Sequence, residues 1–85
     1  MYSVYVIKSL KDGRFYIGQT ENTEERLIKH NKGLVESTKN RRPFVLIFQE
    51  KLESRKEAIN RERYLKSLKG GNEFQKILNN HCGIV

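Results

Sequence analysis

The sequence of 85 residues predicts an α+β fold, with a small three-stranded, mostly antiparallel sheet flanked by helices. Two β-rich runs flank an Asp12-Gly13 pair, a short apolar run lies in the middle of the chain, and helix start signals occur at Asn22 and Ser54. In chain order these elements read β-β-α-β-α-α. The length suits one modest core, so we expect residues 1–85 to form a single domain.

The first two strands are expected to form a β-hairpin, because an Asp-Gly pair between two β-rich runs is a strong turn signal. With Asp12 and Gly13 as a two-residue loop, Tyr5 lies opposite Thr20. Side chains alternate along a strand with period two, so Tyr16 falls on the same face of the sheet as Tyr5. We therefore expect the hairpin to point two phenols to one side.

A first helix is expected after the hairpin. Asn22 is its predicted N-cap, Glu25 lies three residues further on and completes a capping box, and Gly33 ends the helix. Arg26 and His30 are four residues apart and therefore lie on one face of this helix.

Two further helices are expected in the second half of the chain. Ser54 is the predicted N-cap of a helix from about Arg55 to Leu68, and Asn72 can cap a last short helix. Glu62 is the unusual residue of the longer helix, because it points along the edge of the apolar stripe. A carboxylate that faces inward must be paired, protonated or bound to a metal.

The apolar run from Phe44 to Phe48 shows no alternation, which predicts a strand that is covered on both faces. The polar connector before it, residues 33–43, carries the cations Lys39, Arg41 and Arg42. This connector is either a solvated loop or a loop that contacts the phosphates of a nucleic acid.

Positive charge dominates the composition, with 17 Lys and Arg against 10 Asp and Glu and a net charge of +7. Such a charge favours nucleic acid or another polyanion as partner, and a basic protein without such a ligand is the alternative. No apolar run approaches the ~20 residues of a membrane span, and we expect neither a signal peptide nor a membrane partner. Cys82 is the only cysteine, which excludes an internal disulfide and suits the cytoplasm.

The side chains with chemical capability are two tyrosines, an Arg-His pair and one carboxylate. The sequence contains no zinc-binding cluster, no Walker phosphate loop, no dinucleotide fingerprint and no nucleophile elbow. The set suits phosphodiester hydrolysis, which needs a carboxylate to hold a divalent metal, a cation to stabilise developing charge and a group that takes a proton from water. Glu62, Arg26 and a tyrosine can fill these roles. The structural alternatives are sheet-packing aromatics, solvated helix residues and an ion pair of Glu62 with Arg26 or Lys66.

Together these residues resemble the signature of the GIY-YIG nucleases, over nearly the whole chain. Ser3-Val4-Tyr5 stands at the first triplet and keeps only its tyrosine, whereas Tyr16-Ile17-Gly18 matches the second triplet in full. Arg26 follows at the spacing of the family, and His30 lies one turn after it. Glu62 falls in the helix that carries the metal-binding glutamate of the family. The chain looks most like the small branch in which the nuclease module stands alone.

The resemblance implies a metal-dependent endonuclease that acts on DNA, with a structure-selective role in DNA repair or recombination. Glu62 would ligate Mg²⁺ or Mn²⁺, and Arg26 would steady the phosphate. Tyr5 or Tyr16 would position or deprotonate the attacking water, and His30 would relay a proton or contact the backbone. A protein partner or a homodimer would supply targeting. The rival from another class is a non-catalytic, basic nucleic-acid-binding module, and a structural or regulatory protein-binding domain is the third alternative.

Overall fold

Three antiparallel strands and three α-helices follow one another in the order β-β-α-β-α-α in the computed structural model, which describes residues 1–69 and 71–82. The predicted fold class is confirmed. The elements are β1 (Tyr2–Ser9), β2 (Phe15–Thr20), α1 (Thr23–Asn31), a short 3₁₀ helix η1 (Lys39–Arg41), β3 (Phe44–Leu52), α2 (Arg55–Leu68) and α3 (Asn72–Cys82). In the described ranges, no helix is both long enough and apolar enough to cross a membrane.

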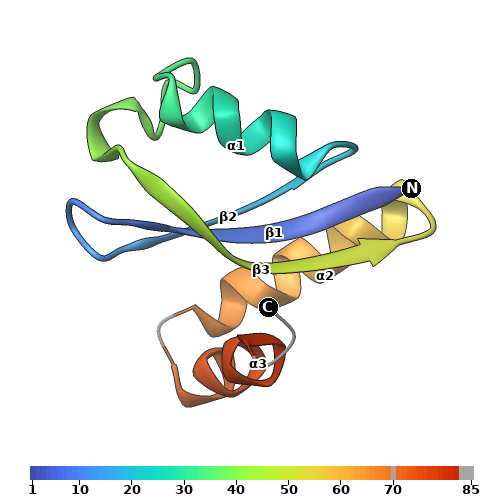
Figure 1. Ribbon diagram of the computed structural model, residues 1–85. Helices are drawn as coiled ribbons and strands as arrows, with labels where there is room; N and C mark the ends of the chain where they lie inside the picture. Colours follow the sequence, from blue (N-terminus) through green and yellow to red (C-terminus); the bar gives the residue numbers. More distant parts are fainter. Residues whose placement is uncertain (70, 83–85) are drawn as a thin grey trace.

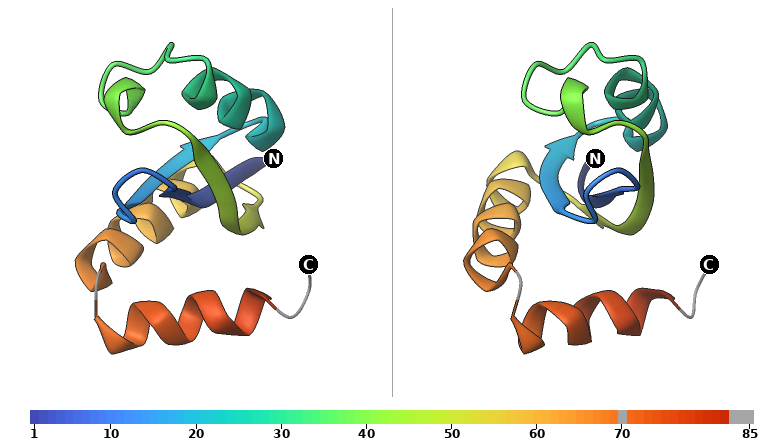
Figure 2. Two further views of the ribbon diagram at one scale, coloured as in Figure 1. Left: turned by 60° about the vertical axis from the view of Figure 1, so that its left-hand side comes forward. Right: turned by 90° about the vertical axis from the view of Figure 1, so that its left-hand side faces the viewer.

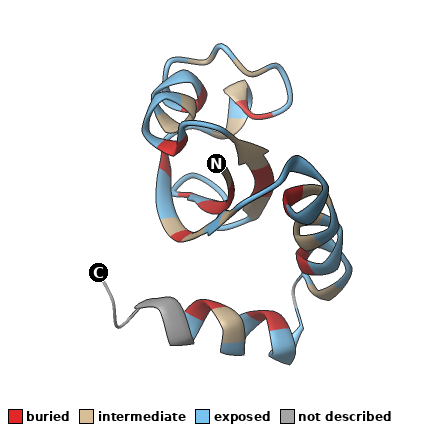
Figure 3. Cartoon of the chain, turned by 90° about the vertical axis from the view of Figure 1, so that its right-hand side faces the viewer, coloured by how far each residue is buried: buried red, intermediate tan, exposed pale blue. Residues whose placement is uncertain are grey.

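The strand β1 lies in the middle of the sheet, in the order β2-β1-β3, and pairs antiparallel with both neighbours. Helix α1 covers one face of the sheet, and α2 and α3 cover the other (Figure 1). The side chains of β1 alternate between the two faces, so Val4 and Val6 enter the core under α2 and α3, whereas Tyr5 and Ile7 enter a smaller core under α1. The buried positions of α3 lie on its side turned towards the sheet (Figure 3).

The pairing of β1 with β2 differs from the predicted register by two residues, because Tyr5 lies opposite Gly18 and not opposite Thr20. The reason is local hydrogen bonding at the turn. The amide of Ser9 donates to the carbonyl of Arg14 (2.9 Å), and the hydroxyl of Ser9 accepts from the amides of the next turn residues (3.1 Å each). These bonds close a longer loop than the two residues expected. A shift by two leaves every side chain on its predicted face.

The helix ends follow the capping signals at three of four places. The side chains of Asn22 and Ser54 accept hydrogen bonds from the backbone amides of Glu25 (3.0 Å) and Glu57 (3.1 Å). Gly33, at φ 79°, follows the end of α1 as predicted. Asn72 is not a cap but the first residue of α3, and the carbonyl of Gly71 accepts the bond from the amide of Gln75.

The expectation that the Phe44–Phe48 strand is covered on both faces is wrong. It continues to Leu52 as the edge strand β3, and Val45 and Leu46 are 38% and 39% exposed. A β-bulge places Ile47 as an extra residue between the pairs Val6–Phe48 and Ile7–Leu46. The bulge reverses the alternation, so Phe44 packs under α1 and Phe48 packs under α2 and α3.

Candidate active site

Four of the predicted catalytic residues meet between α1 and the sheet. Tyr5 comes from β1, Tyr16 from β2, and Arg26 and His30 from α1. The ring centroids of the two tyrosines are 6.4 Å apart, and the ring of His30 lies 5.9 Å from that of Tyr5 and 4.9 Å from that of Tyr16. The two phenols therefore share one face of the sheet, as the strand alternation predicted.

A chain of buried hydrogen bonds runs from Tyr5 through His30 to the connector. His30 Nδ1 lies 2.8 Å from the hydroxyl of Thr38, and His30 Nε2 lies 2.9 Å from the hydroxyl of Tyr5. Because the Thr38 hydroxyl donates to the carbonyl of Val35 (3.4 Å), it accepts from His30 Nδ1–H. Nε2 then carries no hydrogen and accepts from the Tyr5 hydroxyl. All three side chains of this chain are at most 1% exposed.

The imidazole of His30 is held in its neutral form. Burial, together with the smaller effect of the positive charge of Arg26, lowers the pKa of His30 to about 4. A neutral ring with its hydrogen on Nδ1 fits the hydrogen-bond chain, since Nε2 is then free to accept from the Tyr5 hydroxyl. His30 therefore positions the phenol of Tyr5 and does not act as a cation.

Thr38 is the residue of this cluster that sequence reasoning missed, because its hydroxyl was expected to belong to the solvated or phosphate-contacting connector. In the structure it is fully buried behind His30. The only sequence signal is a hydroxyl residue eight positions after a helix-borne histidine, in a connector that folds back over the same helix. Such a signal is too common to identify the contact before the fold is known.

Tyr5 and Tyr16 differ in how far solvent reaches them. Tyr5 is 1% exposed, and its hydroxyl lies so close to Gly18 that a Cβ at that position would be 2.6 Å from it. Burial raises the pKa of Tyr5, and Arg26 partly offsets this effect. Tyr16 is half-buried at the same face. Of the two phenols, Tyr16 is the one that a molecule arriving from solvent can reach.

Arg26 lies against the hydroxyls of both tyrosines. Its interaction with the hydroxyl of Tyr5 raises the pKa of the guanidinium further above its ordinary value. The Nε of Arg26 is buried and has no hydrogen-bond partner within the described residues. Buried donors normally have a partner, so Arg26 keeps hydrogen-bonding capacity that the fold itself does not use.

Glu62 approaches this cluster from α2, on the other side of the sheet. Its side chain is 17% exposed and forms an ion pair of 2.7 Å with the Nζ of Lys66. The partly buried position agrees with the predicted edge of the apolar stripe. Burial is the largest cause of the raised pKa of Tyr5, and the charges of Tyr16 and Glu62 raise it to a smaller extent. The carboxylate of Glu62 therefore lies within electrostatic range of the Tyr5 phenol.

The donor set around Glu62 fits one type of metal site. Within the described ranges, no three His, Cys, Asp or Glu side chains gather as a metal cage. Mg²⁺ is commonly held by one or two carboxylates together with water and substrate phosphates, and does not require a cage made of protein alone. A single partly buried glutamate therefore fits a metal ion that binds together with a phosphate ligand.

The predicted DNA-binding residues lie apart from this cluster, in and after η1. Lys39 pairs with Glu36 (3.1 Å), and Arg41 pairs with Asp12 (3.0 Å) and lies over the ring of Phe44. Arg42 donates from Nε to the carbonyl of Lys39 (2.7 Å). Of these three cations, Arg41 is the one that the fold uses most fully as a structural contact.

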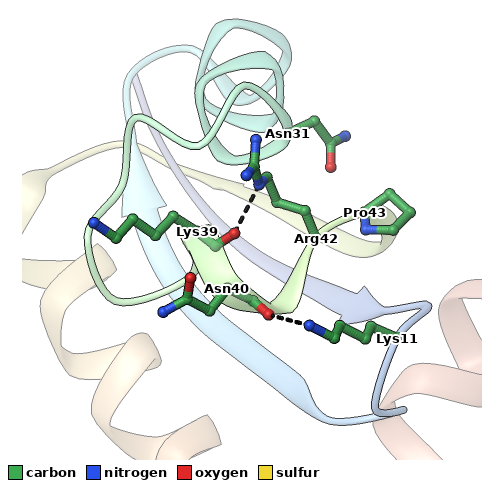
Figure 4. Close-up of a pocket in the computed structure, with 6 residues that line it drawn as sticks. All are labelled: Lys11, Asn31, Lys39, Asn40, Arg42 and Pro43. Atoms are coloured by element: carbon green, nitrogen blue, oxygen red, sulfur yellow. Dashed lines mark hydrogen bonds between the residues drawn. The ribbon is translucent and has the colours of Figure 1, made fainter.

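Two of these cations line a basic pocket at the tip of the β1–β2 hairpin (Figure 4). The pocket has a volume of about 380 Å³ and is lined by Lys11, Asn31, Lys39, Asn40, Arg42 and Pro43. No carboxylate is among these lining residues. The pocket therefore offers a concave surface in which cations and amides face one another.

Comparisons with known proteins agree with this fold. The family model described as "GIY-YIG catalytic domain" matches residues 1–76. The UPF0213 protein of Staphylococcus haemolyticus is 45% identical over 65 residues, which cover 75% of this chain and 78% of that protein. The UPF0213 protein of Clostridium perfringens is 38% identical over 78 residues, which cover 91% of this chain and 83% of that protein. The solution NMR structure of a UPF0213 protein from Bacillus halodurans matches 98% of this chain and 88% of its own, with a TM-score of 0.62 and 29% identity.

Proposed function

The chain belongs to the GIY-YIG catalytic-domain family, and we propose that it is a metal-dependent endonuclease that hydrolyses phosphodiester bonds in DNA. The observation that carries the proposal is the meeting of Tyr5, Tyr16 and Arg26 on one sheet face, with Glu62 in electrostatic range from α2. These are the cation, the phenols and the carboxylate that the reaction requires.

In the proposed reaction, a water molecule attacks phosphorus, the bond from phosphorus to one ester oxygen breaks, and that oxygen takes a proton. Arg26 stabilises the charge that develops on the phosphoryl oxygens, with hydrogen-bonding capacity that the fold leaves unused. Tyr16, the phenol within reach of solvent, orients the attacking water. After it has lost its own proton to solvent, its phenolate takes the proton of the water and passes it to solvent, which protonates the leaving oxygen. His30 and Tyr5 hold the position of Tyr16 through the contacts of their rings.

Glu62 is the proposed ligand of Mg²⁺ or Mn²⁺. A divalent ion bound there would supply Lewis-acid stabilisation of the phosphate and of the leaving oxygen. The carboxylate of Glu62 is partly buried, and Lys66, its partner in the ion pair, is 55% exposed. Because Lys66 lies at the surface, a metal ion can replace it beside Glu62 without rearrangement of the core.

The proposed substrate is DNA, in a structure-selective role in repair or recombination, with a protein partner or a second copy supplying selectivity. The net charge of +7 and the cations Lys39, Arg41 and Arg42 support binding to a polyanion. A single cysteine suits a reducing compartment, and we place the reaction in the cytoplasm. A non-catalytic nucleic-acid-binding module is the competing function, and the basic pocket at the hairpin tip favours it as much as it favours a nuclease.

The substitution Glu62→Gln separates these two functions. We expect it to abolish Mg²⁺- or Mn²⁺-dependent nicking of plasmid and of branched or flapped DNA, and to leave DNA binding in EDTA intact or stronger. The ion pair with Lys66 is half-exposed on the lysine side, so its loss should change the free energy of unfolding by at most about 1 kcal/mol.

Glu25→Gln is the matched control, because Glu25 forms an ion pair with Lys29 at the same four-residue spacing on α1, away from α2. We expect this variant to nick DNA like the wild type. Wild-type protein that binds DNA but never nicks it would contradict the nuclease proposal and support the binding module. Undiminished nicking by Glu62→Gln would remove Glu62 from the metal site.

A further inference from the structure

The two ends of the sheet differ in charge. One end holds the hairpin tip, which lies between the 33–43 connector and the last turn of α2 (Figure 2, right; Figure 1, left side). Cations from all three segments occur there: Lys11, Arg14, Lys39, Arg42 and Lys69. The opposite end has a pocket of about 350 Å³ with two acidic side chains, lined by Ser3, Glu21, Asn22, Thr23, Glu24, Gln49 and Lys51.

A line of cations joins the candidate active site to the end of the sheet that holds the hairpin tip, which we call the basic end. Glu62, Lys66 and Lys69 are spaced by four and three residues and therefore lie along one face of α2 and its C-cap. The distance from position 62 to position 69 is about 10 Å along a helix axis. Burial lowers the pKa of Lys69, and the charges of Arg41, Lys66 and Arg14 lower it further, so each of these three cations lies within electrostatic range of Lys69.

The cations at the hairpin tip are held in place before any ligand arrives. Lys11 donates to the carbonyl of Asn40 (3.0 Å), and Arg42 donates to the carbonyl of Lys39 (2.7 Å), both at the rim of the basic pocket (Figure 4). The guanidinium of Arg42 lies against Gly33, where an added Cβ would be 2.7 Å from Nη1. Backbone carbonyls do not neutralise a cation, so each side chain keeps its charge while it loses rotational freedom.

We propose that one DNA strand leaves the candidate active site towards the hairpin tip, with its phosphates along Lys66, Lys69 and Arg14 and the next phosphate in the basic pocket. This inference rests on the proposed function and gives the substrate a direction on the protein. Projected on the axis of a duplex, the roughly 10 Å from Glu62 to Lys69 corresponds to about three nucleotide steps. At the opposite end Glu21 and Glu24 lie beside Lys51, so carboxylates make that end less favourable for phosphates than the hairpin tip.

Two pairs of substitutions with the same charge change test the path. The tip pair combines Arg14→Ala with Lys69→Ala, and the control pair combines Lys51→Ala with Arg55→Ala at the opposite end. All four side chains are exposed, and each pair lowers the net charge of +7 by two units. Binding of a short DNA duplex is measured by fluorescence anisotropy in EDTA, across a series of salt concentrations.

Each phosphate contact contributes about 0.9 to the slope of log K against log salt, so the tip pair should reduce the slope by about 1.8. The control pair should leave the slope unchanged. Equal effects of both pairs would show that only the overall charge matters and would overturn the path. A larger effect of the control pair would place the strand at the other end.

Amide shifts of ¹⁵N-labelled wild type during the same titration give an independent reading. We expect the largest shifts at Gly13, Arg14 and Lys69, and small shifts at Glu21 and Asn22. The reverse pattern would overturn the path without any use of variants. If DNA binds with the expected amide shifts but is not nicked, the nuclease proposal is contradicted and the proposed strand path is supported. If the protein nicks DNA but the tip pair leaves the salt slope of binding unchanged, the strand path is contradicted and the nuclease proposal is supported.

Discussion

At the scale of single residues, His30 is the most consequential side chain outside the reacting groups. It is fully buried, bonds Thr38 and Tyr5 through its two nitrogens, and faces the rings of Tyr16 and Phe44. A buried polar group of this kind stabilises one arrangement of its neighbours only while every bond is made. Because burial and the charge of Arg26 keep the imidazole neutral, its protonation should be linked to folding.

This linkage predicts a loss of stability in mild acid. The pKa of His30 is about 4 in the fold and about 6.5 in an unfolded chain, so the unfolded state binds more protons between these values. The free energy of unfolding should therefore fall by about 3 kcal/mol as the pH decreases from 6.5 to 4. Urea unfolding across this range measures the fall.

The variant His30→Gln serves as the control for this pH effect, because it lacks the imidazole and keeps the same carboxylates. Its stability at pH 7 is expected to be lower than that of the wild type, since the bonds to Tyr5 and Thr38 are disturbed. Its stability should nevertheless change less between pH 6.5 and 5 than that of the wild type. Parallel pH curves for the two proteins would show that another group causes the loss.

Residue-level prediction from the sequence succeeded where periodicity alone decides the answer. The parity of strand positions placed Tyr5 and Tyr16 on one face, and helix spacing placed Arg26 and His30 together. Thr38 could not be predicted, because its contact depends on the path of a loop. Lys66 and Lys69 could have been predicted from the sequence as cations next to Glu62, since their spacing from Glu62 places all three residues on one helix face.

At the scale of elements, β3 shows why an apolar run without alternation is ambiguous. Phe44 and Phe48 are four residues apart and would share a face in a regular strand, yet they enter different cores. The bulge at Ile47 supplies the change of face, and the exposed Val45 and Leu46 belong to an edge strand. A bulge is set by pairing with β1, so the sequence of β3 by itself predicts a doubly covered strand.

The β1–β2 hairpin gives a prediction at the same scale, because its two glycines serve different purposes. Gly13 takes a positive φ of 74° with no atom near a potential Cβ, whereas Gly18 leaves room for the Tyr5 hydroxyl. Gly18→Ala should force the phenol away from His30 and cost about 1–3 kcal/mol as an overpacked core. It should also change the near-ultraviolet circular dichroism of the tyrosines.

Gly13→Ala is the control for the glycine experiment. It should cost about 1 kcal/mol through backbone strain and leave the tyrosine spectrum unchanged, because no side chain lies near this position. Thermal unfolding and the tyrosine spectrum of both variants are compared with those of the wild type. A Gly18→Ala protein with the wild-type spectrum would show that Tyr5 is not confined by this contact.

At the scale of the whole molecule, size limits how strongly the protein can hold DNA. Its principal extents are 28 × 28 × 24 Å, so one face spans about eight base pairs of duplex at 3.4 Å each. Only the cations on one face can contact phosphates at the same time. Binding should therefore be dominated by charge, and a partner or a second copy would extend the footprint.

A charge-dominated complex predicts that DNA stabilises the fold only at low salt. A ligand at about 100 times its dissociation constant adds about 2.7 kcal/mol to the free energy of unfolding when it binds the folded state alone. For a domain of this size, that corresponds to a rise in Tm of about 10–20 °C. The measurement is thermal unfolding in EDTA with a short duplex, at about 50 mM and at about 500 mM salt.

The rise in Tm should be present at the lower salt concentration and nearly absent at the higher one, at the same concentration of DNA. Higher salt favours counterions over the lysine and arginine contacts, so the population of bound protein falls. The protein without DNA provides the baseline at each salt concentration and accounts for direct effects of salt on the fold. An equal rise at both concentrations would mean that contacts other than charge hold the DNA, and the basic end would lose its role as the main binding surface.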